Sequence, residues 1–229
     1  MKNLLVILAL LIFGAQVYAS DNMFVSATEL AKQERHINEV GFRLLNANGI
    51  NTRARFILST SKEINAYCTL NSRSIVIYRG LYTRLENDDE LAAVLGHEVS
   101  HSVDSYKGIF RGAFFVVNYV VSPQKYEYKS DKRAVDYMVN AGYNPVAMII
   151  VMNKNFPQYR FDWNSSHPLT TRRAMEVYEY IYKKYPEYLA NNAYKDNLYY
   201  QNFLLTSREN RAKFQEKVKT NSTKKLKYK

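Results

Sequence analysis

The chain has 229 residues, of which 47% are hydrophobic and 23% charged, a balance that suits one globular domain with short extensions. Eight Gly and five Pro exclude collagen-like and low-complexity architectures, 14% aromatic residues exclude wholesale disorder, and a single Cys excludes a disulfide framework or a Cys-rich zinc module. The formal net charge of +11 favours an anionic partner without identifying one.

Residues 1–19 have the pattern of an export signal. Lys2 gives a positive start, Leu4 to Phe13 is an apolar run of ten residues, and Val17 and Ala19 are the small residues before a cleavage site. The run is too short for an ordinary transmembrane helix, which needs roughly 20 apolar residues. We therefore expect a cleaved signal peptide and a periplasmic or secreted protein that begins at Ser20. An uncleaved anchor is the alternative.

The next part of the chain predicts one helix, a small sheet and a second helix. Apolar residues recur at helical spacing over 27–47. Three short segments rich in β-branched or aromatic residues predict strands, at 55–59, 65–68 and 74–79. Asn87 can cap a helix that runs to about Val103, with Glu90 in the third position of a capping box.

The rest of the chain is expected to be helical. Residues 109–121 are apolar and predict a buried helix, with a shallow membrane contact as the alternative. Further helices are predicted over about 126–141, 145–156 and 168–184. The fold class is therefore α+β, mostly helical with a sheet of about three strands. We expect residues 20–190 to form the main domain and 191–229 a helical, basic C-terminal extension.

The pattern His97-Glu98-Val99-Ser100-His101 lies on the helix that begins near Asn87. Residues four apart share a helical face, so both imidazoles can bind one metal ion. Glu98 is turned about 100° from His97, which suits a base beside the metal rather than a ligand. With four His and 13 Glu in the chain, random placement gives the pattern in roughly 0.4% of cases. Two unrelated helix histidines are the alternative.

A catalytic zinc ion needs a third protein ligand and one open position. Glu127 and Asp131 lie four residues apart on a later predicted helix. Glu127 can supply the third ligand, and Asp131 can accept a hydrogen bond from a ligand imidazole, with His97 the expected donor. Alone, this pair of acidic residues is more typical of a solvated helix face.

Five segments in order carry a family resemblance: Asn65-Ala66-Tyr67; Arg79-Gly80-Leu81; residues 90–101; residues 127–145; and Ser166-His167-Pro168 with Arg173. The set resembles the HtpX, CAAX prenyl endopeptidase and BepA-like family of zinc metallopeptidases, in its soluble exported branch. It covers about residues 60–175, and Tyr67 stands where the family usually has Phe. The resemblance implies a zincin-like domain in which the sheet edge lies beside the active-site helix.

The resemblance also implies roles for particular residues. His97, His101 and Glu127 would bind one Zn²⁺ per chain, Glu98 would be the general base, and Asp131 would support a ligand. His167 would be catalytic, as a donor to the oxyanion or as a shield over the zinc at rest.

Other residues would have supporting roles in this family. Arg173 would position the loop of His167. The strand Asn65-Ala66-Tyr67 would pair with an extended polypeptide substrate, and an ordinary sheet strand is the alternative. Cys68 is expected to be a small buried residue rather than an inhibitory thiol, and His36 to be structural.

The chain departs from the family in two places. Only 25 residues separate His101 from Glu127, fewer than in many members. The C-terminal extension has no counterpart, and from Arg208 onward it holds nine Lys or Arg against two Glu, a net charge of +7. We expect either a solvated, partly disordered tail or adhesion to anionic phospholipid or a cell-wall polymer. Nucleic acid is not expected as a partner of an exported protein.

The sequence thus predicts an exported zinc metalloendopeptidase with a quality-control or processing role. A catalytically silent or self-inhibited member that binds peptides like a chaperone is the first alternative, although the intact Glu98 argues against it. An envelope adhesion protein that acts through the basic tail is the second.

Overall fold

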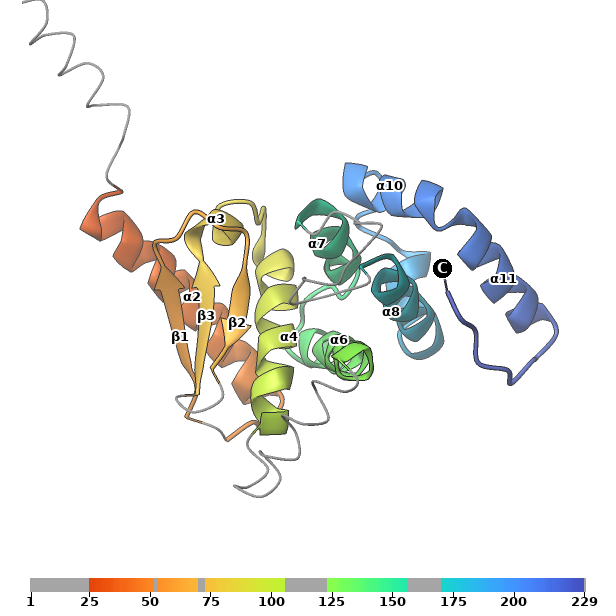
Figure 1. Ribbon diagram of the computed structural model, residues 1–229, viewed down its shortest axis with the longest axis horizontal. Coiled ribbons are helices and arrows are strands. Elements are labelled where there is room, and N and C mark those ends of the chain that lie inside the picture. The colour runs from red at the N-terminus through yellow and green to blue at the C-terminus, as the bar shows by residue number, and fades with distance from the viewer. Residues whose placement is uncertain (1–24, 52, 70–72, 106–122, 156–169, 229) are drawn as a thin grey trace, which may run out of the picture.

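A small mixed sheet lies at one end of the molecule, and helices build the rest (Figure 1). The computed structural model describes residues 25–51, 53–69, 73–105, 123–155 and 170–228. The predicted α+β class is confirmed. Two segments for which predictions were made, 1–19 and 109–121, lie outside the described residues, as does His167. Among the described helices, none is long and apolar enough to cross a membrane.

The sheet has three strands, as predicted: β1 (Arg55–Ser59), β2 (Ala66–Cys68) and β3 (Ser74–Tyr78). Their order is β1-β3-β2, with β1 parallel and β2 antiparallel to β3. Val76 is paired with Ile57 on one side and with Tyr67 on the other. The short strand β2 is thus an edge of the sheet.

Helix α2 (Ala27–Ala47) has the predicted bounds and covers one face of the sheet (Figure 1). Ser26 caps it by accepting a hydrogen bond from the Glu29 amide at 3.1 Å. The apolar side of α2, with Ile37 and Leu44 fully buried, forms part of the core with the sheet.

The short helix α3 (Arg79–Tyr82) follows β3, and α4 (Asp88–Ser105) then runs beside β2 (Figure 1). Asn87 caps α4 as predicted, since its side-chain oxygen accepts from the Glu90 amide at 3.0 Å. Glu90 does not complete the capping box. Its carboxylate instead accepts from the Glu86 amide at 3.2 Å and pairs with Lys154 at 3.1 Å, which fastens α4 to a later helix.

Two helices pack on the other side of α4, α6 (Pro123–Asn140) and α7 (Ala147–Asn155), and α8 (Thr170–Lys184) packs on both of them. Helix α6 begins three residues before the predicted start. It ends before Gly142, whose φ of 77° is the left-handed conformation that glycine adopts without strain. Every residue of α7 from Ala147 to Met152 is buried, which makes this helix the centre of the helical layer.

The C-terminal part is folded up to Tyr228, so the expectation of a partly disordered tail is wrong for the described residues. Helices α9 (Glu187–Ala190), α10 (Leu198–Thr206) and α11 (Arg208–Lys219) form an outer layer on α7 and α8 (Figure 1). Phe203 and Phe214 are buried against Tyr178. The Tyr228 hydroxyl donates to Glu179 on α8. Burial of these aromatic rings stabilises the packing of the C-terminal segment on α8, although its high charge alone suggested disorder.

Gly80 gives a test of the packing beside the sheet. A Cβ at this position would lie 2.0 Å from the backbone oxygen of Lys62, so Gly80→Ala forces two backbone segments apart. We expect the free energy of unfolding to fall by about 3 kcal/mol, measured by chemical denaturation. Gly49→Ala is the control, because nothing lies within 4 Å and only its φ of 59° is strained, at about 1 kcal/mol. Equal losses in both variants would contradict this account.

Candidate metal centre

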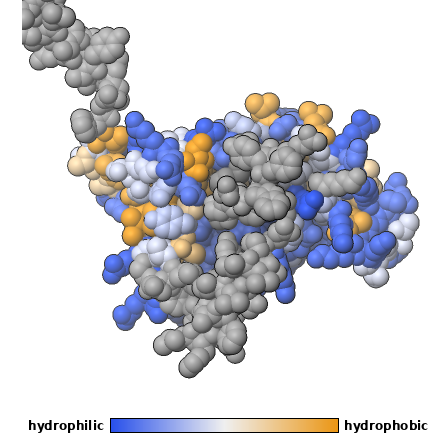
Figure 2. Space-filling model, viewed as in Figure 1, coloured by the Kyte–Doolittle hydropathy of each residue, from blue (hydrophilic) through white to orange (hydrophobic). Residues whose placement is uncertain are grey.

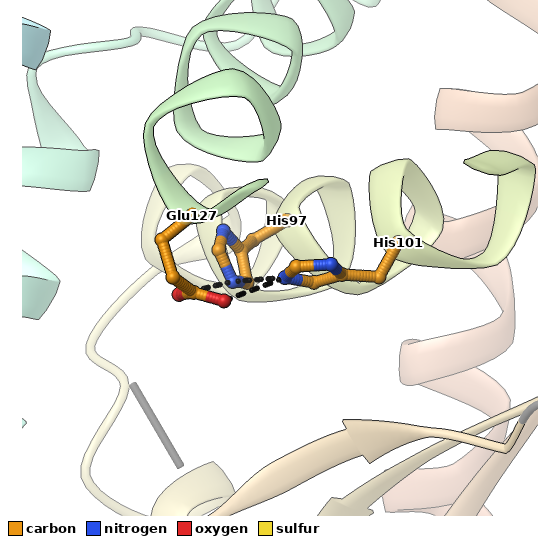
Figure 3. Close-up of side chains that lie close together, drawn as sticks. All are labelled: His97, His101 and Glu127. Carbon is orange, nitrogen blue, oxygen red and sulfur yellow. Dashed lines mark hydrogen bonds and ion pairs between the residues drawn. The ribbon is translucent and has the colours of Figure 1, made fainter. Parts of the chain in front are cut away.

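Two helices bring three donor side chains to one point (Figure 3). His97 and His101 lie on α4 and Glu127 lies on α6. The two Nε2 atoms are 3.0 Å apart, His97 Nε2 is 3.4 Å from Glu127 Oε2, and His101 Nε2 is 3.1 Å from Glu127 Oε1. All three residues are buried. The structure therefore places the three predicted ligands together.

The spacing of these atoms fits a zinc ion. Zinc binds His nitrogen and carboxylate oxygen at 2.0–2.2 Å in tetrahedral geometry, which puts neighbouring ligand atoms about 3.3 Å apart. The three distances, 3.0, 3.1 and 3.4 Å, lie around this value. Two imidazoles and one carboxylate form the three-ligand set that leaves a fourth position open, as a catalytic site requires.

The close contact of α4 and α6 depends on small residues. Gly96 on α4 faces Ala134 on α6, and a Cβ on Gly96 would lie 3.5 Å from that of Ala134. Small residues at a crossing let helix axes approach, so that the side chains next to the crossing can meet. His97, directly after Gly96, is placed where the Glu127 carboxylate can reach it.

A second set of groups fixes the imidazole orientations. Asp131 Oδ1 lies 2.9 Å from His97 Nδ1, and Ser130 Oγ lies 3.3 Å from His101 Nδ1. Each Nδ1 thus has a partner, which turns each Nε2 toward the shared centre. Ser130 was not predicted. Its position three residues after Glu127, on the same side of α6, was the available signal.

Arg173 is the cation of the site. From α8, its Nε and Nη2 bind the Asp131 carboxylate at 2.7 and 2.6 Å, while its Nη1 lies 2.8 Å from Glu127 Oε2. Arg173 was expected to position the loop of His167, but its described contacts are with the Glu127 and Asp131 carboxylates. Burial alone would raise the pKa of Asp131, but Arg173 and His97 outweigh burial and lower it.

The centre attracts positive charge. Burial alone would lower the pKa of His97, but the Glu127 and Asp131 carboxylates outweigh it and raise the pKa to about 10. Three acidic side chains, Glu98, Glu127 and Asp131, are buried here with one arginine. Their combined charge favours a bound cation, which agrees with the donor geometry.

Glu98 lies beside an apolar pocket. Its side chain is buried at 3% exposure, and it lines this pocket together with His97 and Arg173. The remaining lining residues are almost all apolar and come from five elements: Ala66, Leu81, Ala93, Val94, Met148, Val151, Met152 and Thr170. The cavity has a volume of about 40 Å³. Met148 and Met152 on α7 could not be recognised as site residues from the sequence, because a wholly buried helix shows no distinctive pattern.

The predicted substrate strand reaches the same pocket. Ala66 on β2 is one of the lining residues, and Tyr67 is exposed and packs edge-on against Tyr78. Asn65 Oδ1 accepts a hydrogen bond from the Ala66 amide at 2.9 Å. Cys68 follows, and burial, with the charge of Glu98, raises the pKa of its thiol to about 12. The thiol is therefore neutral and a poor nucleophile.

His36 lies apart from the centre. Its Nδ1 is 2.9 Å from the Tyr82 hydroxyl and its Nε2 is 2.8 Å from Asp88 Oδ1. It joins α2 to α3 and to the start of α4, which is a structural role.

An HExxH helix whose two histidines meet a glutamate from a later helix is the ligand arrangement of His₂Glu zinc peptidases. Residues 31–111, about a third of the chain, match peptidase family M48. The match includes His97, Glu98 and His101, while Glu127 and Arg173 lie beyond it.

Individual relatives agree with this family. The chain is 38% identical over 68 residues to the beta-barrel assembly-enhancing protease of Yersinia pestis and 35% identical to that of Escherichia coli K12. Each match covers 29% of this chain and 14% of the relative. The mitochondrial metalloendopeptidase OMA1 of Arabidopsis thaliana is 28% identical over 137 residues, covering 48% of this chain and 28% of the relative. The matches thus span only a small part of these relatives.

The Arg173 contacts give a test that does not depend on activity. Arg173→Lys keeps the charge but loses the planar group that binds both carboxylates. We expect zinc affinity to fall about 10- to 100-fold, measured by competition with a chromophoric chelator. Arg172→Lys is the matched control, since Arg172 is the exposed neighbour and its replacement should leave the affinity unchanged. Unchanged affinity in the Arg173 variant would show that the carboxylates do not need the guanidinium.

Proposed function

We propose that this protein is an exported zinc-dependent metalloendopeptidase. The observation that carries the proposal is that the ligand atoms of His97, His101 and Glu127 lie 3.0–3.4 Å from one another, with Glu98 buried beside them. Export is supported by the pattern of residues 1–19. The bacterial relatives are named for beta-barrel assembly, which favours unfolded or envelope proteins as substrates.

Each residue then has a defined task. Zinc, when bound, would lower the pKa of water toward 7 and polarise the peptide carbonyl. Glu98 takes a proton from the attacking water and passes it to the leaving amine. Asp131 and Ser130 hold the imidazoles in place, and Arg173 holds Glu127 and Asp131. We assign His167 the stabilisation of the oxyanion.

The substrate would bind as an extended strand along β2. As an edge strand, β2 leaves one row of backbone groups unpaired within the sheet. An extended peptide can pair with this row through main-chain hydrogen bonds, which bind the peptide whatever its side chains are. Because Ala66 also lines the pocket, a peptide on β2 passes directly beside Glu98.

The pocket sets which side chain fits next to the scissile bond. A cavity of about 40 Å³ holds roughly three waters, the space of about three or four non-hydrogen atoms. This volume favours Val, Leu, Ile or Met over Trp. A charged side chain would lose its hydration against an almost wholly apolar lining. We therefore assign the enzyme a preference for a medium-sized aliphatic residue at this position.

Replacing Glu98 by Gln tests the enzymatic assignment. The variant keeps the shape of the site but cannot accept a proton, so cleavage of unfolded casein should fall at least 100-fold while one zinc per chain remains bound. Glu127→Ala should lose zinc as well as activity. Glu216→Gln, an exposed change on α11, is the control and should alter neither.

The outcomes separate the alternatives. Activity in Glu98→Gln would refute Glu98 as the base. Bound zinc without cleavage in the wild type would favour the silent, peptide-binding alternative. A wild type without zinc would refute the proposed function.

Met152→Ala tests the pocket. The shorter side chain enlarges the cavity, so cleavage of a peptide with Phe beside the scissile bond should gain about tenfold relative to one with Leu. Met138→Ala is the matched control: Met138 is fully buried on α6 but does not line the pocket. Both variants should lose stability, and only the first should change the Phe-to-Leu ratio. An equal change in both would contradict the assignment.

A further inference from the structure

Helix α10 is apolar on two opposite sides. Tyr200 and Phe203 are buried in the core. Leu198 and Leu205 are 75% and 76% exposed. They are seven residues apart, which is about two helical turns, so they share one side, roughly opposite the buried pair. A surface helix of a globular protein normally turns polar residues outward, so these two leucines require an explanation.

The segment that follows α10 is strongly cationic. Between residues 208 and 228 there are eight Lys or Arg and two Glu. Six of the eight basic side chains are exposed: Arg208, Lys213, Lys219, Lys224, Lys225 and Lys227. Helices α10 and α11 form the outer edge of the molecule at the end away from the sheet (Figure 1). Hydrophobic side chains protrude over α10, and hydrophilic ones dominate the surface toward α11 (Figure 2).

We propose that residues 198–228, called here the C-terminal face, dock on an anionic lipid bilayer through Leu198 and Leu205 and through the basic residues of 208–228. Exposed aliphatic side chains enter the boundary between headgroups and acyl chains, while lysines and arginines bind the anionic headgroups. This combination of apolar anchors with neighbouring cations is the arrangement that peripheral membrane binding requires.

Other occupants fit this face less well. A nucleic acid would bind the cations but would make no favourable contact with isolated leucines. Single strands stack their bases on aromatic side chains, and duplexes bind mainly polar and charged side chains. A second copy of the chain would bring two strongly positive faces together, and like charges repel. Only the bilayer uses both the leucines and the cations.

The docking is reversible and depends on salt. None of the described helices spans the bilayer, and the cationic part of the docking weakens as ionic strength rises. The face does not include any residue of the metal centre, so the inference stands independently of the proposed peptidase activity.

The test is co-sedimentation with large vesicles, using the protein from Ser20 onward. This form contains every described element and lacks the apolar run of residues 4–13, which would bind lipid by itself. The vesicles are either pure phosphatidylcholine or a mixture with 30% phosphatidylglycerol. We expect binding to the anionic vesicles that is at least tenfold tighter than to the neutral ones.

Two sets of substitutions separate the two parts of the face. Leu198→Ser with Leu205→Ser should weaken binding at least tenfold and leave its salt dependence unchanged. Lys224→Gln, Lys225→Gln and Lys227→Gln together should weaken it roughly 100-fold and flatten the salt dependence. Phe42→Ser is the control, because Phe42 is 45% exposed on α2, outside the C-terminal face. The substituted leucine and lysine side chains are exposed, so circular dichroism and Tm of these variants should not change.

Some results would overturn the proposal. These are no binding to anionic vesicles, equal loss of binding in Phe42→Ser and the leucine variant, or no effect of the leucine substitutions. Binding to single-stranded DNA or to an anionic cell-wall polymer with undiminished affinity in the leucine variant, without vesicle binding, would assign the face to that polymer instead.

Discussion

The site depends on Arg173, whose positive charge compensates the buried negative charges of Glu127 and Asp131. Glu127 and Asp131 are 0% and 1% exposed, and each would be strongly destabilising without a partner. The Arg173 guanidinium binds both at 2.6–2.8 Å. Because Arg173 belongs to α8 and the carboxylates to α6, these helices must lie side by side. The need to pair these charges thus fixes the helical layer and, at the same time, the geometry of the metal ligands.

Helix α4 connects this charged cluster with the sheet. One side of α4 lies along β2, and the opposite side packs on α6 and α7 (Figure 1). The histidines, Glu98 and the pocket residues Ala93 and Val94 therefore occur on a single rigid helix. Rigid placement keeps the base and the metal ligands in a constant relation. Strand β2, the proposed reacting groups and the apolar pocket all meet at α4.

The C-terminal layer adds a second surface at the far end of the molecule. Phe203, Phe214 and Tyr228 secure it to α8, so its basic residues are presented from an ordered framework. Ordered presentation costs less entropy on binding than a disordered tail would. A peptidase docked by this face would work near a membrane surface while its metal centre, formed by α4 and α6, stays a separate part of the molecule.

Most of the secondary structure and the candidate metal ligands could be predicted from the sequence. Helical spacing put His97 and His101 on one face, and Asn87 marked the start of their helix, because these signals are local. The sequence also pointed to Glu127 and Asp131. Other features depend on segments far apart in the chain. The Arg173 bridge, the pocket formed with Met148 and Met152, and the ordering of the basic C-terminal segment exist only through packing between elements. Only the tertiary structure could decide them, since neither charge nor periodicity records which helices become neighbours.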